Sequence, residues 1–178
     1  FAALDWENLE SATALWVEAL GRRIAGMGYR IVGCSTTFGG LVPAIALLNS
    51  IKKAAAGAVT VLGGALCEEE AAEGILSLNS GIDYVFSGEG ETAFPGFVKQ
   101  VLSGRLPREK IIYGEPVKKL DTLPLPDYRD YFAQLETIPP ALLPTERFGV
   151  PYETSRGCWH GKCTFCALNG EKNVYREK

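Results

Sequence analysis

The sequence lacks the features of three common protein classes. No apolar run approaches the roughly 18 to 20 residues that span a bilayer. The first residues, FAALDWENLE, have neither the basic start nor the continuous apolar segment of a secretion signal. Lys and Arg are not in excess, because the net charge is −3, and a nucleic-acid binder usually carries a basic face. We therefore expect no membrane partner and no nucleic acid.

The cysteine content is low and uneven. There are five cysteines, an odd number, and three of them fall within nine positions. A disulfide framework in a secreted domain would spread an even count over its loops. The pattern therefore predicts a reducing, cytoplasmic setting and a metal-binding cluster. The chain also begins without Met, which suggests a piece of a longer protein.

Most of the 178 residues alternate between helical and strand patterns. The spacing of apolar residues predicts helices over 5–27, 43–56, 68–78 and 91–102. Short apolar runs predict strands over 29–34, 59–62, 82–86 and 111–113. Repeated strand–glycine turn–helix units indicate a three-layer, Rossmann-like α/β domain with a parallel sheet over 1–114. We expect its first strand to precede Phe1 in the parent chain.

The amino-acid composition changes after Gly114. Seven of the ten prolines follow it, which predicts an extended Pro-rich linker over 115–150, without helix or central strand. A strand is expected again at Tyr152–Ser155, leading into the cysteines. Residues 151–178 would then be the first strand and loop of a second, truncated domain.

The cysteines Cys158, Cys163 and Cys166 are spaced C-x4-C-x2-C, close enough to hold one metal centre. With His160, the only histidine, they could form a Cys3His zinc site. His160 lies in the short segment between the first two cysteines, which leaves it little freedom to complete a tetrahedron. Alternatively, three thiolates could hold a [4Fe–4S] cluster and leave one iron open for a substrate.

The stretch TSRGCWHGKCTFCALNG resembles the cluster loop of radical S-adenosylmethionine (radical SAM) enzymes. The resemblance implies that Cys158, Cys163 and Cys166 bind a [4Fe–4S] cluster, whose open iron chelates S-adenosyl-L-methionine (SAM). It also implies that Phe165 lies beside the SAM adenine. The usual spacing in that family is C-x3-C-x2-C, so the first gap here is one residue longer. The motif is similar to a subgroup that modifies ribosomally made peptides and has a still longer first gap.

The first domain carries a small-residue turn after each of three predicted strands. Neither Gly-x-Gly-x-x-Gly nor Gly-x4-Gly-Lys-Ser/Thr occurs, so a generic dinucleotide or phosphate site is not predicted. The segments IVGCSTTFGG, VTVLGGAL, IDYVFSGEGETAFPGFV and LDTLPLPDY resemble the cobalamin (B12)-binding domain that precedes the radical SAM domain in one class of these enzymes. The resemblance implies cobalamin contacts from the turn residues Ser35, Thr36, Thr37, Phe38, Gly63, Gly64, Ser87, Gly88 and Glu89.

The last predictions for the first domain concern the cobalt ligand and the two remaining cysteines. No Asp-x-His-x-x-Gly motif occurs, so we expect a corrinoid bound without a protein histidine. Cys34 and Cys67, at or after strand ends, are predicted to be structural.

The resemblance implies a cobalamin-dependent radical SAM enzyme, most often a methyltransferase acting on unactivated carbon of a peptide or small molecule. An electron donor such as ferredoxin or flavodoxin would serve it. The (β/α) barrel that would hold most of SAM would follow Lys178, so this chain alone is expected to be inactive.

Three alternatives stay open. One is a radical SAM enzyme with a degenerate corrinoid domain that binds nothing. Another is a non-catalytic Cys3His zinc-binding module. A methylthiotransferase would need three further cysteines in the first domain, where only Cys34 and Cys67 occur.

Overall fold

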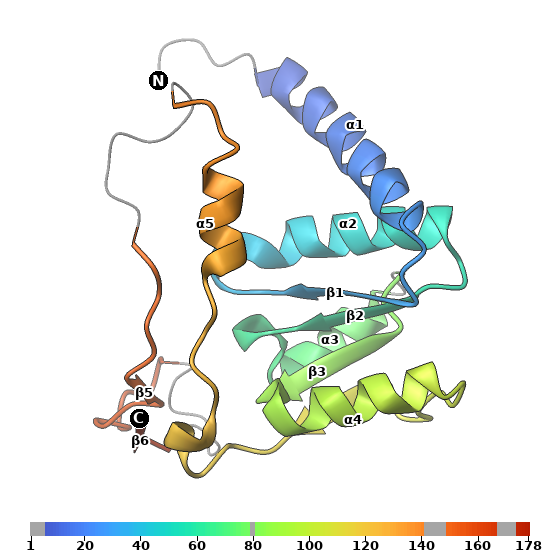
Figure 1. Cartoon of the computed structure of the whole chain (residues 1–178). Coiled ribbons are helices and arrows are strands. Elements are labelled where there is room, and N and C mark those ends of the chain that lie inside the picture. The colour runs from blue at the N-terminus through green and yellow to red at the C-terminus, as the bar shows by residue number, and fades with distance from the viewer. Residues whose placement is uncertain (1–5, 79–80, 141–148, 167–173) are drawn as a thin grey trace. The chain divides into compact units, whose positions relative to one another are not determined.

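The computed structural model describes residues 6–78, 81–140, 149–166 and 174–178 (Figure 1). The chain divides into two compact units, Phe1–Pro116 and Val117–Lys178. In the part of the chain that the structure describes, no helix combines the length and the apolar character needed to cross a membrane. The predicted division of the later residues into a linker at 115–150 and a second domain at 151–178 stays a prediction.

The first unit is built on a four-stranded parallel sheet, which confirms the predicted α/β class. The strands are β1 (Ile31–Ser35), β2 (Val59–Gly63), β3 (Tyr84–Gly88) and β4 (Ile111–Gly114). They lie side by side in chain order, β1-β2-β3-β4, and every neighbouring pair is parallel. The layout is compatible with a Rossmann-like domain. All four strands overlap their predicted ranges.

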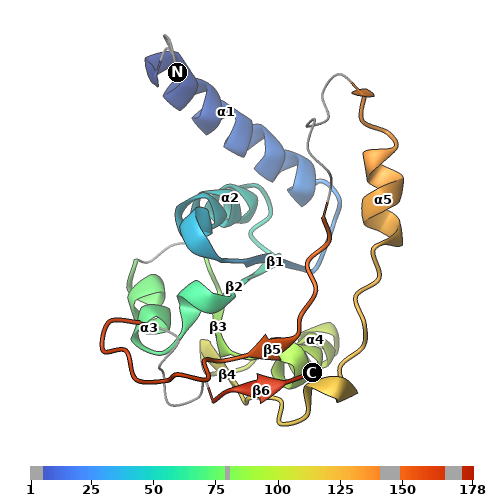
Figure 2. The same ribbon diagram turned by 90° about the vertical axis from the view of Figure 1, so that its left-hand side faces the viewer.

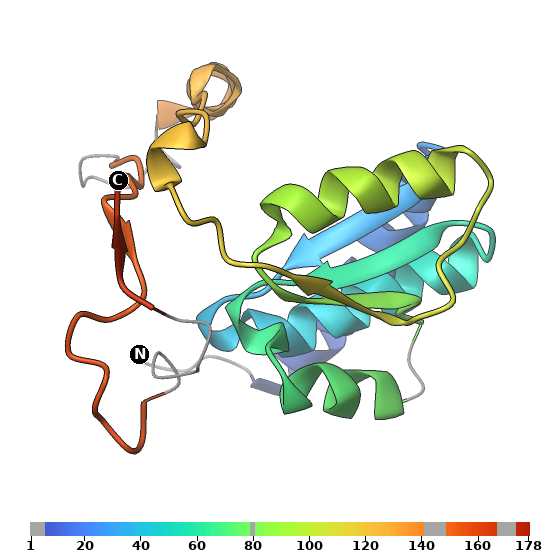
Figure 3. The ribbon, with the colours of Figure 1, turned by 90° about the horizontal axis from the view of Figure 1, so that it is seen from below.

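Helices cover both faces of this sheet. The helices of the first unit are α1 (Trp6–Ala25), α2 (Leu41–Ala54), α3 (Glu70–Ser77) and α4 (Gly90–Leu102), of which α2, α3 and α4 pack against the sheet. Leu48 of α2 and Ile75 of α3 share one buried cluster with Val85. On the other face, Phe97 of α4 packs in a second cluster with Phe86. Figure 3 shows α4 on one side of the sheet and α2 and α3 on the other.

The strand–helix–strand connections of the sheet do not all have the same hand. The strands advance in one direction across the sheet, but α2 and α3 cross one face and α4 crosses the other. The β3–α4–β4 connection therefore has the opposite hand from the two before it, although parallel crossovers in one sheet usually share the right-handed sense.

The helix α1 lies outside α2, on the side away from the sheet (Figure 2). The two helices pack tightly at Gly21, where an added Cβ would lie 2.2 Å from Ser50 Oγ. The chain leaves α1 through Gly28, whose φ of 73° suits glycine and which directly follows the predicted helix range 5–27. Asp5, where this helix was predicted to begin, lies outside the described residues.

A polar clamp joins three elements at the amino edge of the sheet. Lys52 Nζ, from α2, lies 2.6 Å from Asp83 Oδ2, and the same oxygen accepts hydrogen bonds from the Thr60 N–H (2.9 Å) and the Thr60 hydroxyl (3.1 Å). The side chains of Lys52 and Asp83 are each 26% exposed. These contacts from Lys52 and Thr60 to one half-buried carboxylate fix the start of β3.

The second unit contains one helix that the sequence analysis did not predict. The proline content predicted a purely extended segment, but α5 spans Arg129–Leu135 and a 3-10 turn spans Leu120–Thr122. That part of the prediction was wrong, because no proline occurs between Pro126 and Pro139. The Asp127 carboxylate also accepts a hydrogen bond from the Arg129 N–H at 3.0 Å, which satisfies one donor of the first turn.

The segment that leads to the cysteines is only partly a strand. The strand β5 (Ser155–Arg156) pairs antiparallel with β6 (Arg176–Glu177). It overlaps the predicted strand at Ser155 alone. A two-contact ion pair between Arg156 and Glu153 (2.6 and 3.1 Å) fixes the approach to Cys158.

Candidate functional site

The structure brings the three predicted turns together at the carboxyl edge of the sheet. Ser35 ends β1 opposite Gly63, which ends β2, and Gly88 ends β3 opposite Gly114. The loops that follow β1, β2 and β3 therefore start from one edge. This is the edge at which open α/β sheets bind ligands. Ser35, Thr37 and Phe38 are exposed there, and Glu89 is half-buried.

Thr36 connects the loops after β1 and β2 through buried hydrogen bonds. Its side chain is fully buried, its backbone N–H and hydroxyl donate to the Gly63 carbonyl at 2.7 and 2.9 Å, and its Oγ1 lies 3.4 Å from Cys67 Sγ. In this arrangement Thr36 holds the loop backbone. A direct contact between Thr36 and a ligand stays a prediction.

Ser87 plays the same part between the second and third loops. It is 4% exposed, and its Oγ accepts a hydrogen bond from the Glu69 N–H at 2.9 Å. Glu69 comes directly before α3 and has φ 50° and ψ −123°, a conformation that side-chain-bearing residues rarely adopt. Sequence reasoning missed Glu69, since nothing in its type or spacing signals that backbone.

Two glycines permit the close approach of neighbouring loops. Gly64 has φ 101°, and a Cβ there would lie 2.4 Å from Thr36 O and 2.6 Å from Thr36 N. Gly88 has φ 92°, and its Cβ would lie 2.4 Å from Gly114 O. Contacts this short leave no room for a side chain, so glycine is needed at both positions. The predicted contact between Gly64 and cobalamin stays a prediction.

The two cysteines near this edge are embedded in the core of the first unit. Cys67 is fully buried and Cys34 is partly buried against the same apolar cluster. Burial raises the pKa of both thiols above the ordinary value of 9.0, and for Cys67 the hydrogen bond with Thr36 partly opposes that effect. Both side chains are therefore neutral thiols near pH 7, in keeping with a packing role.

The three clustered cysteines follow β5 in an irregular loop. Cys158, Cys163 and Cys166 are half-buried thiols. The loop turns at Gly157 and Gly161, with φ of 78° and 56°, on either side of Cys158. Among the described residues, no three His, Cys, Asp or Glu side chains form a group that could hold a metal ion.

The donor chemistry of this loop nevertheless suits an iron–sulfur cluster. Soft thiolates are the ligands that such clusters require. Because metal binding is coupled to folding of the site, the three thiols would converge only when such a cluster binds. Phe165 is 90% exposed, so its ring is accessible to a ligand. His160 packs edge-on to Trp159, with ring centroids 5.8 Å apart.

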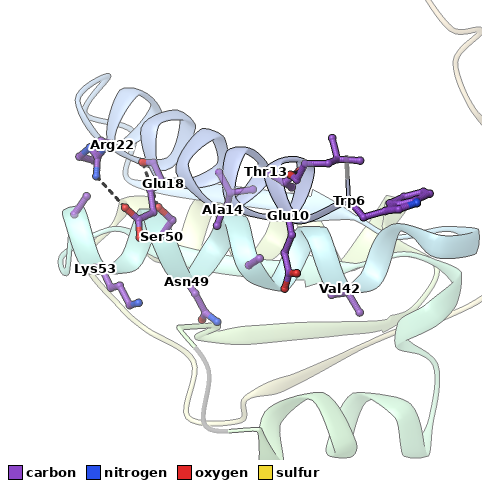
Figure 4. Close-up of a pocket in the computed structure, with 14 residues that line it drawn as sticks. Trp6, Glu10, Thr13, Ala14, Glu18, Arg22, Val42, Asn49, Ser50 and Lys53 are labelled. Carbon is purple, nitrogen blue, oxygen red and sulfur yellow. Dashed lines mark hydrogen bonds and ion pairs between the residues drawn. The ribbon is translucent and has the colours of Figure 1, made fainter. Parts of the chain in front are cut away.

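A separate hollow lies between α1 and α2, and sequence reasoning did not find it (Figure 4). Its volume is about 1110 Å³. Leu9 and Val17 of α1 and Val42 of α2 contribute to its lining, and the ion pair between Glu18 and Arg22 (3.5 Å) lies on its rim. The lining contains no cysteine and no histidine, so it offers no soft metal ligands.

Comparisons with known proteins do not extend this picture. No protein-family model matches the chain, no curated protein matches it, and no solved structure matches it.

Proposed function

We propose that this chain is the front part of a cobalamin-dependent radical SAM enzyme, a methyltransferase that acts on unactivated carbon of a peptide or small molecule. The observation that supports the proposal most is the C-x4-C-x2-C motif directly after β5. A three-thiolate set suits a cluster with one open iron better than a closed zinc site, which needs four protein ligands.

In this proposal the second unit holds the cluster and part of SAM. Cys158, Cys163 and Cys166 would provide the three thiolates, and the exposed ring of Phe165 would lie beside the adenine. Bound together, the cluster with SAM would supply one-electron chemistry at an unactivated C–H, and cobalamin would supply a methyl group. An external electron donor such as ferredoxin or flavodoxin would reduce the cluster.

The first unit would hold cobalamin at the carboxyl edge of the sheet. The buried hydroxyls of Thr36 and Ser87 would keep the three loops in place. Gly63 and Gly64 would expose backbone to the ligand, and Ser87, Gly88 and Glu89 would form the third side of the site. No histidine is available in these loops, so cobalt would receive no imidazole from them.

The proposal is tested by loading the 178-residue chain with both cofactors. After anaerobic incubation with iron, sulfide and hydroxocobalamin, the chain is separated by gel filtration and its iron and cobalt are counted. One cluster and one corrinoid per chain are expected. A cluster without cobalt would favour a degenerate corrinoid domain. A single zinc ion with no affinity for iron and sulfide would favour the zinc-binding module and contradict the proposal.

The partition of the ligands is tested with two variants. Cys163→Ala should abolish cluster uptake and leave cobalamin binding intact, because the two sites lie in different units. His160→Ala should leave the cluster intact, whereas in a Cys3His zinc site it would remove one of four ligands.

A further inference from the structure

Two residues at the carboxyl edge have a costly backbone conformation. Phe38 and Glu69 both have φ of 50°, and among residues 6–78, 81–140, 149–166 and 174–178 no other non-glycine residue has a positive φ. Such conformations cost free energy and are concentrated at functional sites. Here they occur on two adjacent loops, one after β1 and one after β2.

Phe38 also exposes an aromatic ring to solvent. Its side chain is 94% exposed, on a 3-10 turn that spans Phe38–Gly40. The turn contains glycine at its next two positions, and neither Gly39 nor Gly40 has an atom within 4 Å of an added Cβ. Because almost all of its side chain is exposed, the Phe38 ring contributes little to the core. A ring held in solvent by a strained backbone is placed to stack on a flat surface.

A hydrogen bond to the buried Ser87 side chain stabilises the backbone conformation of Glu69. The Ser87 hydroxyl accepts the Glu69 N–H at 2.9 Å, while the Glu69 side chain is exposed. The carboxylate is an acceptor for hydrogen-bond donors. The loop residues 35–40, 63–69 and 87–91 contain no Lys or Arg. A phosphate group would therefore meet no side-chain cation in these loops, whereas an amide or a cation could bind to the carboxylate.

We propose that Phe38 and Glu69 form a two-point grip for the ligand of this edge. The Phe38 ring packs on a flat, unsaturated face of the ligand, and the Glu69 carboxylate accepts hydrogen bonds from donor groups at the ligand margin. The ligand class is thus a flat ring system that bears amide or other donor groups and no phosphate facing these loops. This inference rests on the proposed function, in which the ring system is the corrin of cobalamin with its amide side chains.

The test combines binding with stability in the full chain, with hydroxocobalamin as the probe. Phe38→Ala and Phe38→Gly should each weaken binding about tenfold, since both remove the stacking ring. Only Phe38→Gly removes the free-energy cost of the positive φ at this position. It alone should therefore raise the melting temperature, by roughly 2 to 5 °C. Opposite signs for binding and stability at one position distinguish a ligand contact from a residue needed for folding.

The second point of the grip is tested in the same assay. Glu69→Gly should weaken binding about tenfold and raise the melting temperature. Glu69→Gln keeps an acceptor oxygen and should weaken binding by roughly threefold or less. Glu70→Gln, at the adjacent exposed position in α3, is the matched control and should bind as the wild type does.

The outcomes separate the two hypotheses. If the wild type binds hydroxocobalamin and the Phe38 and Glu69 variants bind equally well, the grip is wrong and the proposed function stands. If the wild type does not bind hydroxocobalamin, the cobalamin part of the proposed function fails, and the grip fails with it. A fall in melting temperature on Phe38→Gly would also overturn the inference, because it would show that the ring stabilises the fold.

Discussion

The substitution Gly64→Ala tests the packing of the first two carboxyl-edge loops. Gly64 has φ 101° and ψ 177°, and holding a side-chain-bearing residue there costs about 1 to 3 kcal/mol. The added Cβ would also lie 2.4 and 2.6 Å from the backbone O and N of Thr36, atoms that cannot rotate away.

Relief of this clash would separate the first two loops. The hydrogen bonds from the Thr36 N–H and hydroxyl to Gly63 O, at 2.7 and 2.9 Å, would then weaken, at about 1 kcal/mol each. Together the effects predict that Gly64→Ala lowers the free energy of unfolding by about 3 to 5 kcal/mol. Domains of ordinary size are stable by about 5 to 15 kcal/mol, so the variant should still fold at low temperature.

The measurement is urea unfolding followed by far-UV circular dichroism. Gly74→Ala is the matched control, because Gly74 lies inside α3 and a Cβ there meets no atom within 4 Å. It should raise the free energy of unfolding by about 0.5 to 1 kcal/mol, through helix propensity alone. A loss of less than about 1 kcal/mol in Gly64→Ala would refute this prediction. It would show that neither the positive φ nor the Thr36 backbone excludes a side chain at position 64.

Two further predictions concern the polar clamp and the buried thiols. Asp83→Ala should lower the free energy of unfolding by about 2 to 3 kcal/mol, because it leaves Lys52 and Thr60 without their shared acceptor; equal stability in urea unfolding would contradict this. The raised pKa of Cys34 and Cys67 means that unfolding releases protons above the ordinary thiol pKa of 9.0. Stability from this source is complete below pH 9 and is lost as the pH rises toward the folded-state pKa. Urea unfolding at about pH 8 and pH 10 should show this loss in the wild type, and it should be smaller when both cysteines are replaced by Ala.

The fold of the first unit could be predicted because its signals are local. Apolar runs such as Val59–Leu62 and the glycines after them specify buried parallel strands without reference to the rest of the chain. The hand of the β3–α4–β4 connection depends on which face α4 covers, and strand and helix patterns do not encode that choice. α5 was missed because proline density was averaged over a segment that contains a proline-free stretch.

The placement of the three turns at one edge could be predicted from the sequence, but the contacts that hold the loops could not. The predicted parallel sheet, with a turn after each strand, implies that Ser35, Gly63 and Gly88 lie at one edge, and the strand register confirms this. The strained backbones of Phe38 and Glu69 arise from contacts between loops that are distant in the sequence, and no residue type announces them. The sequence predicted that Cys158, Cys163 and Cys166 hold one metal centre, but among the described residues they form no group that could do so. Under the proposed function their convergence would accompany binding of the cluster.

Metal analysis of the anaerobically reconstituted chain tests the central claim most directly. The account predicts about four iron atoms and four sulfides per chain, with a broad absorption near about 400 nm. Both signals should be lost in Cys158→Ala, Cys163→Ala and Cys166→Ala and kept in His160→Ala. One tightly bound zinc ion per chain, no iron–sulfur absorption and loss of the metal in His160→Ala would contradict it.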